Sequence, residues 1–321
     1  MSDALMMSIL IPVIAIVLDS VIGDPYNFPH PVRYIGNALD FIESKVRLHL
    51  RNLWLAGVFT LLLLCALSWG VITLLVSIPI IGMLFGIYFS YAGLALGCLL
   101  KEGRHVGDLV EQGHLEEARR ALSMLVSRDT ANMNEDEIRR SLAETISENL
   151  NDGFIAPLFY LVLTGPAGLW VYKTVSTMDS MWGYKNDRFE QLGYAGAKID
   201  DVLAFIPARL TAWAMYFAGK LMSLDTLNAK KHFKVDARKM ESPNAGWPMS
   251  MAAWLIGGQM GGETMYFGEA KNKPILGPLN EKWHSFKINQ LIDLCKRTAL
   301  VASIGLILAK VVLSLVFFDN Y

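Results

Sequence analysis

Long apolar segments alternate with polar ones along the whole chain, and the lengths of the apolar segments match a lipid bilayer. A helix needs about 20 apolar residues to cross the hydrocarbon core. The segments that approach this length are residues 6–23, 53–76, 79–100, 154–176, 202–224 and 299–318. Prolines and glycines interrupt 154–176 and 202–224, as expected where irregular backbone lines a cavity. The pattern predicts an all-α, polytopic integral membrane protein with about four to six membrane helices, some of them broken or re-entrant.

The polar loop 101–153 is itself predicted to be helical. Apolar residues recur at helical spacing within 115–126, and charged residues occupy the opposite face. Asn134 is followed three positions later by Glu137, which predicts a capping box at the start of the next helix. This cytoplasmic loop should therefore be ordered.

A second polar loop covers residues 225–298 and has a mixed character. Within it, residues 246–262 are too short and glycine-rich for a membrane span, so they predict a re-entrant or buried helix. No β-rich window and no repeat is evident, and the sequence predicts a single membrane-embedded domain over residues 1–321.

Composition agrees with a membrane location. The chain is 53% hydrophobic and 18% charged, with a mean hydropathy of +0.34, whereas soluble domains carry about 25% charged residues. A net charge of −1 argues against nucleic acid as a partner. The three cysteines are far apart, which argues against a disulfide scaffold or a zinc site. The N-terminus lacks the basic residues of a signal peptide, so its apolar segment is predicted to be retained.

The distribution of Lys and Arg predicts the orientation in the cell membrane. Three loops, 24–52, 101–153 and 225–298, contain four, seven and eleven of these residues and are predicted to face the cytoplasm. Both termini are then outside. Loop 177–201 contains three, which would place it outside as well, although the interrupted segments beside it leave its side open.

The most informative polar stretch is ETISENLNDGFIAPLFY at residues 144–160. On a helix, Glu144 and Glu148 lie one turn apart, and Asp152 follows on the same face. Three stacked acids repel one another unless a positive group lies between them, either a metal, a phosphate-bound cation, or Arg and Lys from elsewhere. The alternative is a solvated acidic face of a surface helix.

Several other polar residues lie beside or inside apolar segments. His30 and Arg33 lie near the first span, where His30 fits a structural turn and Arg33 fits either a pairing network or a site. Arg128, followed by Asp129, could grip a carboxylate or phosphate or cap its own helix. Arg209 lies inside an apolar segment and needs a partner, for which Asp200 and Asp201 are nearest in sequence.

Two further segments are candidates for ligand binding. The first, residues 171–210, is the densest polar stretch beside the membrane and contains Lys173, Asp179, Lys185 and Asn186. The second is the loop 242–250, in which Asn244 could bind a polar ligand and Trp247 could stack on one, although a plain loop has the same composition. There is no P-loop, no GxGxxG after a strand, no GxSxG and no HExxH.

Taken in order, the polar motifs resemble one family. The chain closely resembles the adenosylcobinamide-phosphate synthase family, cobalamin biosynthesis protein CobD/CbiB. The motifs that carry this resemblance are LDSVIGDP with PHPVRYIG, LVSRDT, ETISENLNDGFIAPLFY, YKTVSTMDSMWGYKNDR, DDVLAFIPARLTA and SPNAGWPMS. The resemblance extends from about residue 17 to about residue 277. One departure is Ala204, where the family pattern leads us to expect Asn.

The resemblance implies a multi-pass membrane enzyme of late corrin assembly. It would join the ring D propionate of adenosylcobyric acid to (R)-1-aminopropan-2-ol or its O-phosphate, giving adenosylcobinamide or its phosphate. It further implies ATP and magnesium, because a carboxylate must be activated before an amine can form an amide with it. Such an enzyme is an acid–amine ligase that acts on a cobalt corrinoid, contacts the lipid bilayer, and is consistent with association with other membrane-bound assembly enzymes or with a second copy of itself.

The resemblance also suggests roles for residues. The predicted magnesium ligands are Glu144, Glu148 and Asp152, and the predicted phosphate-binding cations are Lys173, Lys185, Arg128 and Arg209. Asn149, Asn186 and Asn244 are predicted to bind the corrin amides, while Trp182, Tyr184 and Trp247 are predicted to lie against the macrocycle. Asp129, Asp179, Asp201, His30 and Arg33 complete the predicted substrate-binding set.

Two other functions compete with this one. A non-catalytic membrane sensor or regulator resembling the ampicillin-resistance protein AmpE would keep the fold but is expected to lose the polar motifs, which this chain keeps. A transporter would also have broken helices with internal charges, but no matching pair of interrupted segments in two inverted halves is evident. Only the ligase requires ATP turnover that depends on both organic substrates.

Overall fold

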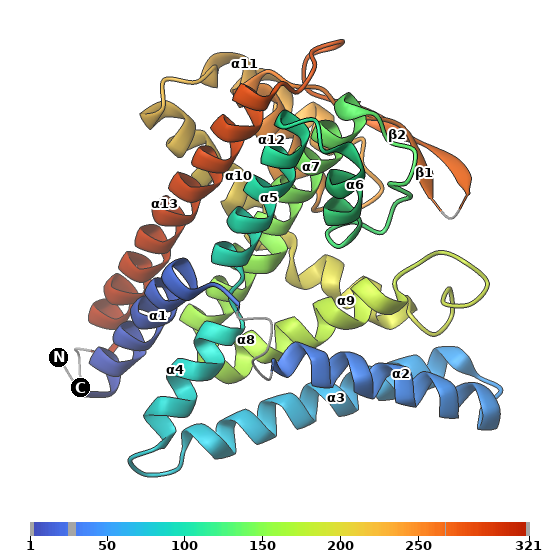
Figure 1. Ribbon diagram of the computed structural model, residues 1–321. Helices are drawn as coiled ribbons and strands as arrows, with labels where there is room; N and C mark the ends of the chain where they lie inside the picture. The colour runs from blue at the N-terminus through green and yellow to red at the C-terminus, as the bar shows by residue number, and fades with distance from the viewer. Residues whose placement is uncertain (1–2, 25–29, 267, 319–321) are drawn as a thin grey trace. The chain divides into compact units, whose positions relative to one another are not determined.

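The protein is described here by a computed structural model that covers residues 3–24, 30–266 and 268–318. Residues 25–29, which belong to the N-terminal motif, lie outside the described residues. The elements, shown in Figure 1, are α1 (Asp3–Ile22), α2 (Pro31–His49), α3 (Leu53–Val76), α4 (Gly82–Ala92), α5 (Leu96–Glu111), α6 (Leu115–Ser123), α7 (Glu135–Leu150), the π-helix η1 (Asn151–Ile155), α8 (Ala156–Trp182), α9 (Tyr194–Leu203), α10 (Phe205–Leu221), α11 (Thr226–Ala237), α12 (Gly246–Ile256), β1 (Met260–Tyr266), β2 (Glu269–Leu276) and α13 (Ser285–Phe318).

The predominantly helical, membrane-spanning fold predicted above is confirmed. In the described part of the chain, the helices long and apolar enough to cross a membrane are Leu53–Val76, Gly82–Glu111, Glu135–Trp182 and Ser285–Val316. The consecutive helices Tyr194–Leu203 and Phe205–Leu221 pass the same test together as one bent pair. The first predicted span differs, because Met6–Ile22 falls among the shorter apolar helices.

Helix breaks occur where the sequence carries turn-forming residues. The break between α3 and α4 contains Ser77 and Pro79, and the residue after this proline, Ile80, adopts a φ of 70°. Gly165 interrupts α8 with φ 76° and ψ −171°, directly before Pro166. Proline disfavours helical geometry in the residue before it, and glycine alone tolerates this backbone at little cost. The interruption predicted within 154–176 is therefore present.

The chain divides into two compact units. The first unit comprises Met1–Ala95, Ala156–Ala204 and Gly305–Tyr321, and the second comprises Leu96–Ile155 and Phe205–Ile304. Both are built from discontinuous segments, and the predicted site residues fall into both of them.

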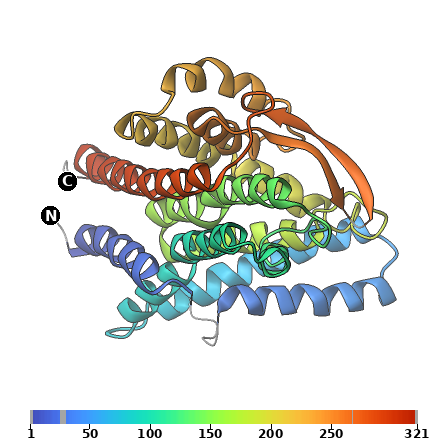
Figure 2. The same cartoon turned by 45° about the horizontal axis from the view of Figure 1, so that its top comes forward.

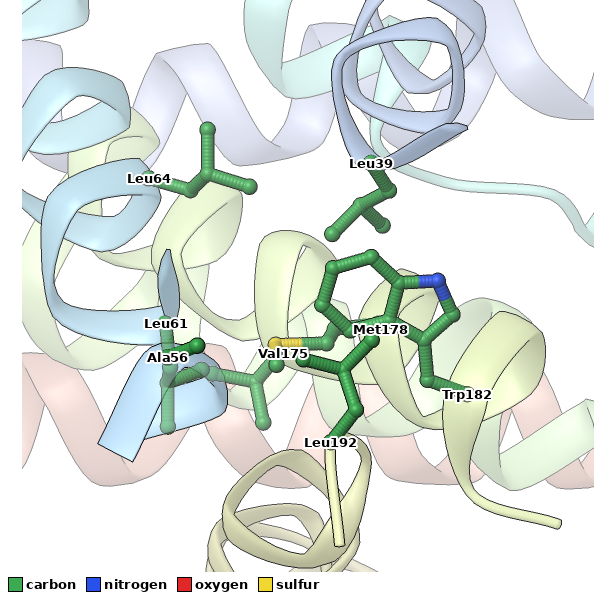
Figure 3. Close-up of a cluster of buried hydrophobic side chains, with 8 residues drawn as sticks. All are labelled: Leu39, Ala56, Leu61, Leu64, Val175, Met178, Trp182 and Leu192. Carbon is green, nitrogen blue, oxygen red and sulfur yellow. The ribbon is translucent and has the colours of Figure 1, made fainter. Parts of the chain in front are cut away.

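A cluster of buried apolar side chains lies within the first unit (Figure 3). Leu39 from α2 and Leu61 from α3 contribute to it, together with Trp182 at the end of α8 and Leu192 from the segment that follows. Trp182 is 1% exposed. Because a buried indole offers no face to a ligand, the predicted stacking of Trp182 on a corrin is wrong in this structure.

The second unit contains the predicted helical loop 101–153 as the helices α5, α6 and α7. Asn134 caps α7 with the reciprocal bonds of a capping box: its side chain accepts from the Glu137 amide, and the Glu137 carboxylate accepts from the Asn134 amide. Ala118 and Leu122 are buried on α6, as their spacing predicted. The stretch 246–262 contains α12, which is buried along most of its length.

The second unit also contains a β-hairpin that the sequence pattern did not reveal. Strand β1 pairs antiparallel with β2, and Tyr266 lies opposite Glu269. The two paired strands are visible from different directions in Figures 1 and 2. Gly268 has a φ of 81°, which a tight hairpin turn requires. Glycines and lysines hide the alternation of a half-buried strand, and β-propensity depends strongly on tertiary contacts.

Candidate functional site

The acidic stretch predicted as a site lies at the junction of α7 with a π-helical turn. Residues Asn151–Ile155 form the π-helix η1, a rare widening of the helix that often marks functional positions. The Asn151 amide nitrogen donates to Asp152 Oδ1 at 2.7 Å, and Thr211 Oγ1 donates to Asn151 Oδ1 at 2.9 Å. The widened turn is thereby tied to α10.

Glu144 lies at the centre of a buried charge cluster. Its side chain is fully buried, and Arg128 Nη1 donates to Glu144 Oε2 at 2.8 Å. The backbone amide of Gly261 donates to Glu144 Oε1 at 2.8 Å, and Lys273 Nζ lies 3.9 Å from Oε2. Burial alone would lower the pKa of Arg128, but the neighbouring Glu144 carboxylate raises it above the usual value. The cations that balance this acidic stretch therefore come from an arginine before α7 and a lysine on the hairpin.

Both carboxylate oxygens of Glu144 already accept hydrogen bonds, which bears on the predicted magnesium site. Within the described residues, no group of three or more His, Cys, Asp or Glu side chains could hold a metal ion. Glu144, Glu148 and Asp152 therefore do not fit a resident magnesium ion in this arrangement. Their role as metal ligands stays a prediction that would require Arg128 to release Glu144.

A polar cavity of about 540 Å³ lies beside this cluster. Arg128 and Asp129 line it from the segment before α7, Arg140 and Ser141 line it from α7, and Thr264 lines it from β1. The complete lining also includes Asn132, Met133, Glu137, Glu263, Met265 and Gly268. The segment and the hairpin are tied together, because the Asp129 amide donates to the Met265 carbonyl at 3.0 Å and the Gly268 amide donates to Asp129 Oδ2 at 2.7 Å.

Arg209 has different partners from the carboxylates expected at the sequence level. Its Nη1 donates to the Phe205 carbonyl and to Asn244 Oδ1, both at 2.8 Å, and its Nη2 donates to the Pro243 carbonyl at 3.1 Å. The guanidinium carbon also lies 3.5 Å from the Phe205 ring centre and 4.5 Å from that of Trp247. Three predicted residues, Arg209, Asn244 and Trp247, thus meet in one cluster.

The remaining predicted residues of the second unit lie near these clusters on α7. Asn149 Nδ2 donates to Thr145 Oγ1 at 3.0 Å, which holds the amide against its own helix. Glu148 is half-buried. The electrostatic surroundings of Arg128 include Glu148 as well as Glu144.

In the first unit, His30 performs the structural role of a helix cap. Its Nδ1 accepts from the Val32 amide at 3.3 Å at the start of α2, and its Nε2 lies 3.7 Å from Asp24 Oδ2. Burial lowers the pKa of His30, the positive charges of Lys173 and Arg33 act in the same direction, and Asp24 opposes them. His30 and Lys173, which are far apart in sequence, are therefore electrostatic neighbours.

The segment after α8 is anchored by a network that the sequence did not indicate. Arg188 Nε and Nη2 donate to Glu43 Oε1 and Oε2 at 2.9 and 3.0 Å, and Arg47 Nε donates to Oε1 at 2.7 Å. Asn186 caps the turn through its side chain, which accepts from the Phe189 amide at 3.0 Å. Asp201 lies 3.9 Å from Lys198 Nζ on α9.

The predicted residues are thus shared between the units. Those of the first unit are His30, Arg33, Lys173, Asp179, Tyr184, Lys185, Asn186 and Asp201, and those of the second are Arg128, Asp129, Glu144, Glu148, Asn149, Asp152, Arg209, Asn244 and Trp247. The sequence analysis missed Lys273, Gly261 and Thr264. These residues approach the site only because the folded hairpin packs against α7, and no local sequence pattern indicates that contact.

Comparison with known proteins gives a consistent result. The model of a family described as CobD/Cbib protein matches residues 12–295. The chain is 35% identical over 306 residues to a cobalamin biosynthesis protein CobD of Clostridium perfringens, covering 94% of this chain and 96% of the relative. It is 39% identical over 269 residues to one of Geobacter metallireducens, covering 82% and 84% respectively. No solved structure matches the chain.

Proposed function

The chain belongs to the CobD/Cbib protein family of cobalamin biosynthesis, and on that premise we propose that it is an adenosylcobinamide-phosphate synthase. The reaction would join the ring D propionate of adenosylcobyric acid to (R)-1-aminopropan-2-ol or its O-phosphate. The observation that carries the proposal is the polar cavity of about 540 Å³ beside the buried Arg128–Glu144 pair. It supports an enzyme because it presents fixed cationic donors in a hollow large enough for a small substrate.

The chemistry needs an activated carboxylate, since an acid and an amine at neutral pH form a salt. ATP would supply the activation by transferring its terminal phosphoryl group to a carboxylate oxygen, with ADP as the leaving group. The amine nitrogen would then form the amide bond, the carbon–oxygen bond to phosphate would break, and the amine would lose a proton. The task of the protein is to bind the phosphate groups, orient the two organic substrates and exclude water.

Arg128 is suited to a phosphate-binding role. A guanidinium offers five donors in a rigid fork, and one of its nitrogens, Nη1, is committed to Glu144. The fully buried carboxylate holds the fork in place, so that the remaining donors can face the cavity that Arg128 lines. Lys173, Lys185 and Arg209 are the further proposed phosphate ligands.

Magnesium in this proposal arrives with ATP. Mg²⁺ usually keeps several waters and is held by one or two carboxylates together with substrate phosphates, so a preformed cage of three carboxylates is not required. Asn149, Asn186 and Asn244 are proposed to bind the neutral corrin amides, and Tyr184 and Trp247 to contact the macrocycle. Asp129, Asp179 and Asp201 are proposed to orient these groups. The large polar loops are proposed to face the cytoplasm from the cell membrane.

The test uses detergent-solubilised protein with adenosylcobyric acid, ATP, magnesium and either aminopropanol or its phosphate. Mass spectrometry of the corrin should show the mass gain of amide formation with one of the amines and none without ATP. Absence of a corrin product with either amine, in folded protein, would favour the AmpE-like regulator instead.

A variant tests the proposed metal ligands separately. If Glu148 holds magnesium, Glu148→Ala should lower activity and raise the magnesium concentration needed for half-maximal rate. Full activity with unchanged magnesium dependence would remove Glu148 from the metal site.

A further inference from the structure

An apolar groove lies between α2 and α3, two helices of the first unit that are side by side in both views (Figures 1 and 2). Its volume is about 520 Å³, which is within the usual range of small-molecule sites. Ile42 and Val46 form the wall on α2, and Leu55, Phe59 and Leu63 form most of the wall on α3. The groove therefore offers an apolar binding surface between two helices.

The groove opens on a surface that faces lipid. Helix α3 is long and apolar enough to cross a membrane, and its groove residues Leu55 and Phe59 remain 55% and 68% exposed. On α2, Phe41 and Leu48 are also exposed, and their spacing of seven residues puts them on one face of that helix. In a bilayer these side chains meet hydrocarbon instead of water. An acyl chain can therefore enter the groove from the side.

The length of the groove along α3 matches one leaflet of a membrane. Leu55, Phe59 and Leu63 follow one another at intervals of four residues, and thus line the groove from one face of the helix. The helix begins at Leu53, and the rise from there to Leu63 is about 15 Å at 1.5 Å per residue. Half of a hydrocarbon core of about 30 Å has the same length. An acyl chain along these residues would extend from the start of α3 to the middle of the bilayer.

The end of the groove at the start of α3 is positively charged. Arg51 lines it there with an exposed side chain that, within the described part of the chain, forms no ion pair. Lys45 is exposed as well, and its ammonium group lies 5.6 Å from the ring centre of Phe41. The stretch 45–51 contains no acidic residue, and the preceding acid, Glu43, is bonded to two arginines. This end of the groove therefore attracts a negatively charged group.

We propose that the groove between α2 and α3 binds one anionic phospholipid, with an acyl chain along Leu55, Phe59 and Leu63 and the phosphate at Arg51. A phospholipid joins an anionic group to a hydrocarbon chain of one leaflet's length, which is the combination that the groove fits. The cytoplasmic leaflet carries the anionic lipids, and loop 24–52 is proposed above to face the cytoplasm. The site is independent of the proposed reaction, since no predicted site residue lines this groove.

Native mass spectrometry of the full-length protein in detergent tests the proposal. The probes are phosphatidylglycerol and phosphatidylcholine with the same acyl chains. The parent protein should retain its first phosphatidylglycerol more tightly than its first phosphatidylcholine. Arg51→Gln should bind phosphatidylglycerol about fivefold more weakly, because one cation at the lipid surface contributes about that factor. Arg104→Gln, which removes an exposed arginine of α5, is the matched control and should bind like the parent.

A second pair of variants tests the apolar part of the site. Leu55→Trp should abolish retention of the first lipid of either kind, because the indole occupies the space of the acyl chain. Leu62→Trp is the matched control, since Leu62 is 64% exposed on the same helix and lies outside the groove lining. It should bind both lipids like the parent. Both positions are exposed, so both variants should melt at the temperature of the parent.

Three results would overturn the proposal. The first is equal affinity of the parent for the two lipids, and the second is equal lipid binding by Leu55→Trp and Leu62→Trp. The third is displacement of the lipid by adenosylcobyric acid, which would assign the groove to a corrinoid. Where Leu55→Trp does not fold, an unchanged phosphatidylglycerol affinity of Arg51→Gln is decisive against the site. None of these measurements depends on turnover, so the lipid site and the proposed reaction stand or fail separately.

Discussion

Arg209 on α10 donates a hydrogen bond from Nη1 to Oδ1 of Asn244 at 2.8 Å, 35 positions further along the chain. The same guanidinium is flanked by the rings of Phe205 and Trp247. An arginine within an apolar segment is here stabilised by neutral oxygens and aromatic faces, which together replace its hydration. The bond also fixes the loop that precedes α12 against α10.

A double-mutant cycle on Arg209 and Asn244 should show coupling. Arg209→Lys loses the planar fork and the stacking, and Asn244→Ala loses the acceptor, so the double variant should be more stable than the sum of the single effects predicts by about 1 kcal/mol. Thermal melting in detergent measures it. Asn228→Ala, which removes an exposed side chain bonded to Asp225, is the control and should be additive with Arg209→Lys. Additivity of the Arg209 and Asn244 effects would refute the coupling.

The Arg128–Glu144 pair should be costly to break from one side. Glu144→Ala leaves a buried guanidinium without its carboxylate, and we expect a loss of about 3–5 kcal/mol in unfolding free energy. Replacing both residues together, as Arg128→Met with Glu144→Leu, should restore much of that loss because no buried charge remains. Reversible denaturation of the single and double variants measures this. A double variant as unstable as the single one would show that Lys273 and Gly261, rather than Arg128, dominate the cluster.

The Glu43 network predicts a stability change with pH. Burial alone would raise the pKa of Glu43, but hydrogen bonds from Arg188 and Arg47 lower it below the usual value. A carboxyl with a lowered folded-state pKa contributes stability that is fully present above its unfolded pKa of about 4.3 and is lost as pH falls through the folded value.

The comparison of Glu43→Gln with the parent checks this sign. The melting temperature of the parent should exceed that of Glu43→Gln near neutral pH, and the difference should shrink as the pH falls below about 4. Arg188→Lys, which loses the two-pronged contact, should lie between them. A difference in melting temperature between the parent and Glu43→Gln that stays constant across this pH range would contradict a role for the charge of Glu43.

Two glycines on α3 should respond oppositely to alanine. A Cβ on Gly57 would lie 2.1 Å from the Leu192 carbonyl oxygen, whereas a Cβ on Gly70 would meet nothing within 4 Å. Gly57→Ala should therefore displace the segment around Leu192 and cost about 1–3 kcal/mol. Gly70→Ala should leave stability unchanged or raise it, because alanine favours helix. Equal melting temperatures for the two variants would show that the contact at Gly57 is not close.

Features set by short stretches of sequence were predictable. The apolar segment 53–76 forms α3 with the predicted bounds, because its length and composition allow only a helix in an apolar environment. The capping box of Asn134 and Glu137 and the interruption at Gly165–Pro166 depend on residues within one turn of each other. Helix ends were less accurate: the predicted span 79–100 corresponds to Gly82–Glu111, since amphipathic residues continue the helix beyond the apolar stretch.

The order of the polar motifs was enough to identify the family, and the acidic stretch was correctly expected to require positive partners. Only the tertiary structure decided which positive partners the acidic stretch has. Gly261 reaches Glu144 across 117 positions, and Lys273 does so only because β2 pairs with β1. Helices and caps arise from local spacing, whereas a buried charge takes whichever donors the packed chain brings within bonding distance.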